Sequence, residues 1–114
     1  MRRLCFALDL KNDPQLIEQY KAWHVPGAPP AAVTQAIRDA GIEGLQIFLC
    51  GNRLLMIMEV TPNYSIGARE AADAANAAVQ DWEKLMWTFQ QPLPWAARSQ
   101  KWVPAELIYD LANQ

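Results

Sequence analysis

Alternation of hydrophobic and polar positions predicts three strands. Residues 3–10 alternate strictly, as in a strand with one buried face. The apolar face carries Leu4, Phe6, Leu8 and Leu10. Residues 45–50 and 54–60 form a second pair of expected strands, joined by the glycine and asparagine at 51–52, which predicts a β-hairpin. The strand at 54–60 is apolar on both faces until Glu59, which indicates a sheet covered on both sides.

Helical spacing of apolar residues predicts two short helices between the first strand and the hairpin. Asp13 is the expected N-cap of the first, with Pro14 in the first helical position. This helix should end near His24, because a proline follows two residues later. The second helix is expected from about Pro30 to Gly41.

A long helix and a last strand are expected in the remaining chain. The helix should span roughly residues 69–90. Its apolar stripe would consist of Ala71, Ala75, Ala78, Val79, Trp82, Leu85, Met86 and Phe89. The last strand is expected at residues 102–111, where Pro104 favours an edge or a bulge.

The resulting order, βα(α)ββαβ, is typical of an α+β, ferredoxin-like fold with one antiparallel sheet. We expect a single domain over residues 1–114. Helices cover only one face of such a sheet, yet the central strands are apolar on both. A second copy of the chain packed sheet to sheet would cover the other face, so we expect a homodimer of the dimeric α/β barrel type.

Composition narrows the function classes. A formal net charge of -2 and a pI near 5.3 provide no basic field for nucleic acid. No apolar run reaches about 18 residues, so we expect no membrane span, and the N-terminal segment is too short for a signal peptide. A cytoplasmic protein is therefore expected, with Cys5 and Cys50 as free thiols. One histidine and two distant cysteines make no zinc site, and there is no glycine-rich phosphate loop.

His24 is the only histidine, and it follows Tyr20 by four residues. On a helix, residues four apart share a face, so two groups that give and accept protons would point the same way. The helix C-terminus also favours positive charge on the imidazole. His24 is thus a candidate general acid or base, with Tyr20 as a hydroxyl binder. The alternative is a histidine that only caps helix carbonyl groups.

Five tryptophans are many for 114 residues. Trp82 lies on the apolar stripe and fits a core role, whereas Trp95 lies in a loop, where its indole face could stack on a sugar. Gln46, Glu59 and Glu83 are polar positions within apolar segments. They are either solvated positions or the few polar groups that a sugar pocket requires.

The chain resembles the L-rhamnose mutarotase family along nearly its whole length. The resemblance rests on Tyr20-x-x-x-His24-x-Pro26 after the first strand, the hairpin from Gln46-Ile47-Phe48-Leu49 to Met56-Ile57-Met58-Glu59-Val60, and Trp82-Glu83-Lys84-Leu85-Met86 on the long helix. Residues 81–95 look closer still to the relatives that act on L-fucose.

The resemblance implies a cofactor-free isomerase, an aldose mutarotase of carbohydrate metabolism. Such an enzyme interconverts the α and β anomers of a 6-deoxy-L-sugar, a small-molecule monosaccharide, most probably L-fucose, with L-rhamnose second. It also implies that His24 is the proton donor and that Tyr20 binds substrate. Trp82 matches the first of two adjacent tryptophans that line the family's sugar site. With Glu83 and Gln46, these residues form the expected site, which contains no metal.

Three positions depart from the rhamnose enzymes of that family. Glu83 replaces the second tryptophan of the pair. Leu45 aligns with a tyrosine, and Ala28 aligns with a tryptophan in the loop after the histidine. Because side chains that contact the sugar have changed, L-fucose is expected ahead of L-rhamnose.

Two other classes fit the same fold. In a small haem-degrading or quinone-forming monooxygenase, His24 would be a haem ligand. In a non-catalytic sugar-binding dimer, the same pocket would bind sugar without accelerating anomer exchange. Fold alone does not choose among the three.

Overall fold

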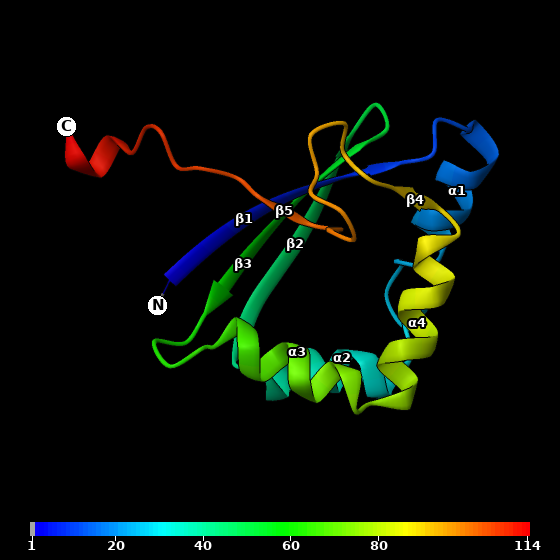
Figure 1. Ribbon diagram of the computed structural model, residues 1–114, viewed down its shortest axis with the longest axis horizontal. Coiled ribbons are helices and arrows are strands. Elements are labelled where there is room, and N and C mark those ends of the chain that lie inside the picture. Colours follow the sequence, from blue (N-terminus) through cyan, green and yellow to red (C-terminus); the bar gives the residue numbers. More distant parts are fainter. Residues whose placement is uncertain (1) are drawn as a thin grey trace.

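The computed structural model describes residues 2–114, and its strands form one antiparallel sheet. The strands are β1 (Arg2–Leu10), β2 (Ile42–Cys50), β3 (Arg53–Val60), β4 (Gln90–Gln91) and β5 (Val103–Pro104). Their order is β2-β3-β1-β4, and β5 also pairs with β1. The helices lie together on one side of the sheet in Figure 1. The predicted α+β class with a single antiparallel sheet is confirmed.

Strand register assigns each side chain to a face of the sheet, because directly paired residues of antiparallel strands share a face. One face, here called the inner face, carries Leu8 and its partner Leu54, which are 0% and 1% exposed. The outer face carries Leu55 and its partner Phe48, which are 39% and 49% exposed. The strand at 54–60 is therefore apolar on both faces, as predicted, but only the inner face is covered by this chain.

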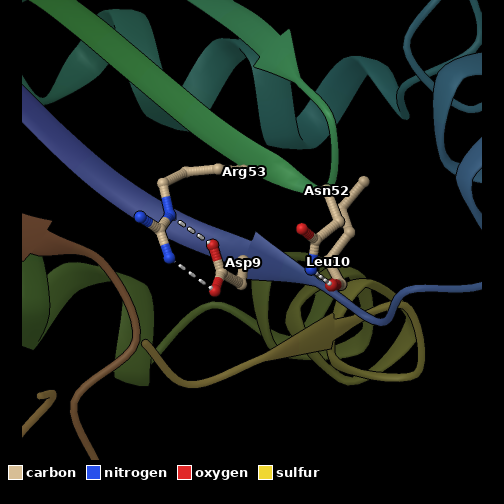
Figure 2. A network of polar contacts seen from close by, with 4 residues as sticks. All are labelled: Asp9, Leu10, Asn52 and Arg53. Carbon is tan, nitrogen blue, oxygen red and sulfur yellow. Dashed lines mark hydrogen bonds and ion pairs between the residues drawn. The ribbon is translucent and has the colours of Figure 1, made fainter. Parts of the chain in front are cut away.

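An ion pair on the outer face joins β1 to β3. Asp9 is 5% exposed, and its carboxylate accepts hydrogen bonds from Arg53 Nε at 2.8 Å and Arg53 Nη2 at 3.2 Å. Beside it, the Asn52 side chain donates to the carbonyl oxygen of Leu10 at 2.9 Å (Figure 2). The hairpin turn is thereby fixed to the end of β1. The turn glycine, Gly51, has a φ of 62°, in the left-handed region that glycine favours.

The first two helices follow their sequence signals closely. Helix α1 (Pro14–Ala22) begins where predicted, and the Asp13 carboxylate accepts from two backbone N–H groups of the first turn. Helix α2 (Ala31–Asp39) ends just before Gly41, whose φ is 87°.

The expected long helix at 69–90 is two helices, so that prediction was wrong. Helix α3 (Ile66–Ala74) and helix α4 (Ala77–Trp87) are separated by Asn76, whose φ of -107° and ψ of 107° are not helical. The Asn76 side chain accepts from the N–H groups of Ala78 and Val79, so it caps a new helix instead of continuing the old one.

The break redirects the chain, and α4 leaves α3 at a steep angle in Figure 1. The expected apolar stripe is therefore only partly buried. Val79, Met86 and Phe89 are buried, whereas Ala71 and Ala75 are exposed.

The expected last strand at 102–111 is also much shorter than predicted. Only β5 pairs with β1, followed by one hydrogen bond from Ala105 N to Cys5 O at 2.8 Å. Pro104 has no N–H group for further pairing, and the rest of this edge of β1 is occupied by β4. Residues 106–114 are exposed and lead away from the helices to a short 3-10 turn, Leu111–Asn113 (Figure 1).

Two clusters of buried side chains form the core between the inner face and the helices. One contains Leu10, Tyr20, Leu54, Met86 and Phe89, and the other contains Ile42, Met56, Met58, Val60 and Tyr64. Trp102 packs against both. Within residues 2–114, no helix is long and apolar enough to cross a bilayer.

Candidate functional site

His24 lies just beyond the C-terminus of α1, and its position is set by the backbone of Tyr20. Its Nδ1 is 2.6 Å from the Tyr20 carbonyl oxygen. A carbonyl oxygen only accepts, so Nδ1 carries the proton in this hydrogen bond. Nε2 is then the nitrogen that can exchange a proton with a ligand. The carbonyl-capping contact considered from the sequence is present, and it leaves the other nitrogen available for acid or base chemistry.

The Tyr20 side chain is 4% exposed and stacks on His24, with ring centroids 4.3 Å apart. Gln90 Nε2 donates to the Tyr20 hydroxyl oxygen at 3.3 Å. Burial raises the pKa of Tyr20, and the hydrogen bond from Gln90 lowers it by less. The phenol therefore stays neutral at physiological pH and keeps a proton to donate.

Trp82 on α4 closes the other side of His24. The two ring centroids are 5.7 Å apart, and Trp23 meets the Trp82 ring edge to face at 6.1 Å. Trp82 also packs against the core cluster that contains Tyr20. Its core role and its place beside the histidine are therefore compatible.

These side chains open onto a pocket of about 570 Å³ between the inner face of the sheet and the helices. Tyr20, His24, Trp82 and Glu83 all line it, so the structure brings together four of the five site residues expected from the sequence. The sheet and α2 provide apolar walls, formed by Phe6, Leu45, Ile47, Met56, Met58, Val33 and Ile37. An apolar pocket with a few polar groups is typical of a small-molecule site.

Gln46 is the fifth expected residue, and the structure does not bring it to this pocket. It pairs with Ile57 on the outer face, whereas its neighbours Leu45 and Ile47 line the pocket. A side chain one position away in a strand points to the opposite face. Gln46 is therefore not carried into the candidate site.

Trp95 is also separate from the pocket. Its ring lies 5.0 Å from the guanidinium carbon of Arg53, the partner of Asp9, and 60% of the residue is exposed. Its indole face is thus engaged by a cation and not by the pocket considered for a sugar.

Helix α3 adds a charged wall that sequence reasoning missed. Arg69 and Asp73 line the pocket, and Arg69 Nε lies 3.4 Å from Asp73 Oδ2. Arg69 Nη1 also lies 3.6 Å from the sulfur of Met58 on the pocket floor. The spacing of four residues could have indicated the ion pair, but not that it faces the pocket, because that depends on the break at Asn76.

Gln90 and the loop before β5 complete the pocket and were likewise missed. Gln90 was placed at the end of the long helix, but it lies in β4 and is 5% exposed. Gln100, Lys101 and Trp102 also line the pocket, and Lys101 Nζ lies 5.0 Å from the ring centre of Trp87. In the part of the chain that is described, no three His, Cys, Asp or Glu side chains gather into a potential metal-ligand group.

Comparisons with known proteins agree on one family. The family model described as L-rhamnose mutarotase matches residues 3–111. An L-fucose mutarotase of Xanthomonas campestris pv. campestris is 44% identical over 113 residues, covering 99% of this chain and 90% of that protein. A UPF0734 protein of Dictyostelium discoideum is 34% identical over 110 residues, covering 92% of this chain and 86% of that protein.

Two solved structures share the fold. The L-rhamnose mutarotase of Formosa agariphila has a TM-score of 0.64 at 21% identity, covering 97% of this chain and 99% of that one. The tetracenomycin F2 cyclase of Streptomyces glaucescens, a type-II polyketide cyclase, has a TM-score of 0.60 at 15% identity, with 96% of each chain covered. At these identities the likeness supports the ferredoxin-like fold and not a particular reaction.

Proposed function

The chain belongs to the L-rhamnose mutarotase family, and on that premise we propose that it is an isomerase that interconverts the α and β anomers of L-fucose. The observation that carries the choice of sugar is the 44% identity, over 99% of the chain, with a protein named L-fucose mutarotase. L-rhamnose is the second candidate, because the family model bears its name.

The pocket supports this proposal by its residue types. A 6-deoxy sugar has an apolar methyl group and C–H faces, which the Trp82 ring and the apolar walls can contact. Its hydroxyl groups need donors and acceptors, which Tyr20, Glu83, Gln90 and the ion pair of Arg69 supply. We assign substrate contact to Tyr20, Trp82 and Glu83.

We assign the proton transfer to His24. Ring opening breaks the bond between C1 and the ring oxygen, which must gain a proton while the anomeric hydroxyl loses one. With Nδ1 held on the Tyr20 carbonyl oxygen, Nε2 of the imidazolium form can protonate the ring oxygen and take the proton back on closure. Rotation about the C1–C2 bond of the open aldehyde before closure produces the other anomer. The reaction needs no net gain or loss of atoms or electrons.

The test is NMR saturation transfer between the α and β anomeric protons, with and without protein. We expect enhanced exchange with L-fucose, weaker enhancement with L-rhamnose, and none with sugars that lack the 6-deoxy group. Enhancement with L-rhamnose alone would change the substrate and keep the reaction. Binding of L-fucose without faster exchange would identify a sugar-binding protein in place of an enzyme.

Glu83 is the residue we expect to set the choice of sugar. Glu83→Trp restores the tryptophan pair that the resemblance implies for the rhamnose enzymes. The ratio of kcat/KM for L-rhamnose to that for L-fucose should rise by roughly tenfold, the size of one gained contact and one lost hydroxyl partner. Glu83→Gln, which removes the charge without adding a ring, is the control, and it should change the ratio by less. An unchanged ratio in Glu83→Trp would free this position from any role in specificity.

We further propose that the protein is a homodimer packed through the outer face of the sheet. That face carries Phe48, Leu55 and Ile57, large apolar side chains that this chain leaves partly or largely exposed. Stable dimers commonly bury about 800 Å² on each partner, and apolar sheet faces are suited to this. The proposal implies a sedimentation mass of twice 12.9 kDa.

Leu55→Asp should disrupt this dimer, because a carboxylate would be buried without a partner in the middle of the face. We expect the sedimentation mass to fall to that of a single chain at micromolar concentration. Val25→Asp is the control, since Val25 is 52% exposed but lies in the loop after α1, away from the sheet. A native protein that sediments as a single chain would rule out the dimer.

Location and domain organisation remain part of the proposal. We place the protein in the cytoplasm, supported by the free thiols of Cys5 and Cys50, which a reducing compartment would preserve. We propose that residues 1–114 act as one mutarotase domain, supported by the family match over 3–111.

A further inference from the structure

Gln90 is a polar side chain buried at the pocket wall, and no role has been assigned to it. It is 5% exposed, lies between the buried Phe89 and the half-buried Gln91, and lines the pocket. Strand β4 fixes its backbone by pairing it with Leu10. A buried amide is costly unless its hydrogen bonds are made. The bond it makes is to Tyr20, with Nε2 donating to the hydroxyl oxygen at 3.3 Å.

The direction of this bond determines what the Tyr20 hydroxyl can do. An amide NH₂ group only donates, so the Tyr20 oxygen is the acceptor. A phenol has a single proton, and that proton is therefore not used in the contact with Gln90. Since Tyr20 lines the pocket, a pocket ligand is the acceptor that its proton can reach.

We propose that Gln90 is a positioning residue that makes Tyr20 a hydrogen-bond donor to a sugar oxygen. The inference rests on the proposed mutarotase function and deepens it. Gln90 acts through Tyr20. Tyr20 in turn supports His24 through its ring at 4.3 Å and its carbonyl oxygen at 2.6 Å. Gln90 thus holds the hydroxyl end of Tyr20, and the backbone end of Tyr20 holds the histidine.

Gln90→Glu tests the direction of the bond through pH. Above the pKa of the introduced carboxyl, the carboxylate only accepts, so Tyr20 would turn its proton toward it and the sugar would lose a donor. Below that pKa, the carboxyl O–H can donate to Tyr20 as the amide does. The ratio of variant to native kcat/KM should therefore be reduced roughly tenfold at high pH, and it should recover as the pH falls.

Other titratable or charged groups face this pocket, and the ratio cancels their effects because they are common to both proteins. They are His24, Glu83, Lys101, Arg69, Glu70 and Asp73. Gln91→Glu is the matched control, because Gln91 is the next residue of β4 and pairs with Asp9 on the outer face. Its ratio to native should not depend on pH in the same way.

A double-mutant cycle provides a second measurement that needs no buried charge. Gln90→Met should raise KM more than it lowers kcat, and adding it to Tyr20→Phe should cause little further loss, since the hydroxyl that Gln90 directs is already absent. A flat pH ratio for Gln90→Glu, or additive losses in the cycle, would overturn the positioning role. Absence of exchange in the native protein would instead contradict the proposed function, so the two failures are distinguishable.

Discussion

Replacing His24 with alanine is expected to slow enzyme-catalysed anomer exchange by about 10²–10⁴-fold, the contribution of a well-placed general acid or base. The fold should persist, because His24 follows the end of α1 and its only polar contact is the bond from Nδ1 to the Tyr20 carbonyl oxygen. NMR saturation transfer measures the rate, and circular dichroism checks the fold.

The structure also provides a chemical control for this variant. Removing the imidazole leaves a space beside Tyr20 and Trp82, which flank it at 4.3 and 5.7 Å. Free imidazole added to His24→Ala should enter this space and restore part of the exchange rate. Val25→Ala, which changes an exposed neighbour, should retain native exchange. Native exchange in a folded His24→Ala protein would remove His24 from the mechanism.

Local signals explain why much of the fold could be predicted from the sequence. The alternation at residues 3–10, the cap at Asp13 and the turn at Gly51 act within a few residues of the chain, and each element they predict is present. The motif of Tyr20 and His24 is equally local, since residues four apart share a helix face. The heart of the candidate site was therefore visible in the sequence.

The failures have long-range causes. Helical spacing at 69–90 did not reveal that Asn76 prefers to cap a new helix, because an asparagine inside a helical pattern can do either. The strand expected at 102–111 lost most of its edge to Gln90 and Gln91, which depends on pairing across 80 residues. Neither competition is visible in a short window of sequence.

The rest of the site was hidden for similar reasons. Because β2 is apolar on both sides, its pattern could not tell whether Gln46 or its neighbours face the pocket. Gln90 looked like the end of a helix, and only its pairing with Leu10 places it beside Tyr20. The wall formed by Arg69 and Asp73 requires the turn between α3 and α4.

Leu10→Ala is expected to have the largest effect on stability and to affect the site as well. Leu10 is 0% exposed, and truncating a fully buried leucine typically lowers the free energy of unfolding by about 2–5 kcal/mol. Leu10 belongs to the same buried cluster as Tyr20, and its backbone pairs with Gln90. A cavity there should loosen both residues that hold the Tyr20 hydroxyl, so kcat/KM should fall even where the variant is fully folded.

Leu8→Ala separates the two effects. Leu8 lies two residues earlier on the same face of β1, is also 0% exposed, and lies outside the cluster that contains Tyr20. Urea unfolding should show comparable losses of stability for the two variants, whereas exchange measured well below both unfolding transitions should fall further in Leu10→Ala. Equal rates in the two folded variants would mean that Tyr20 is held by its own contacts with His24 and Gln90, and that the core beneath the pocket contributes only stability.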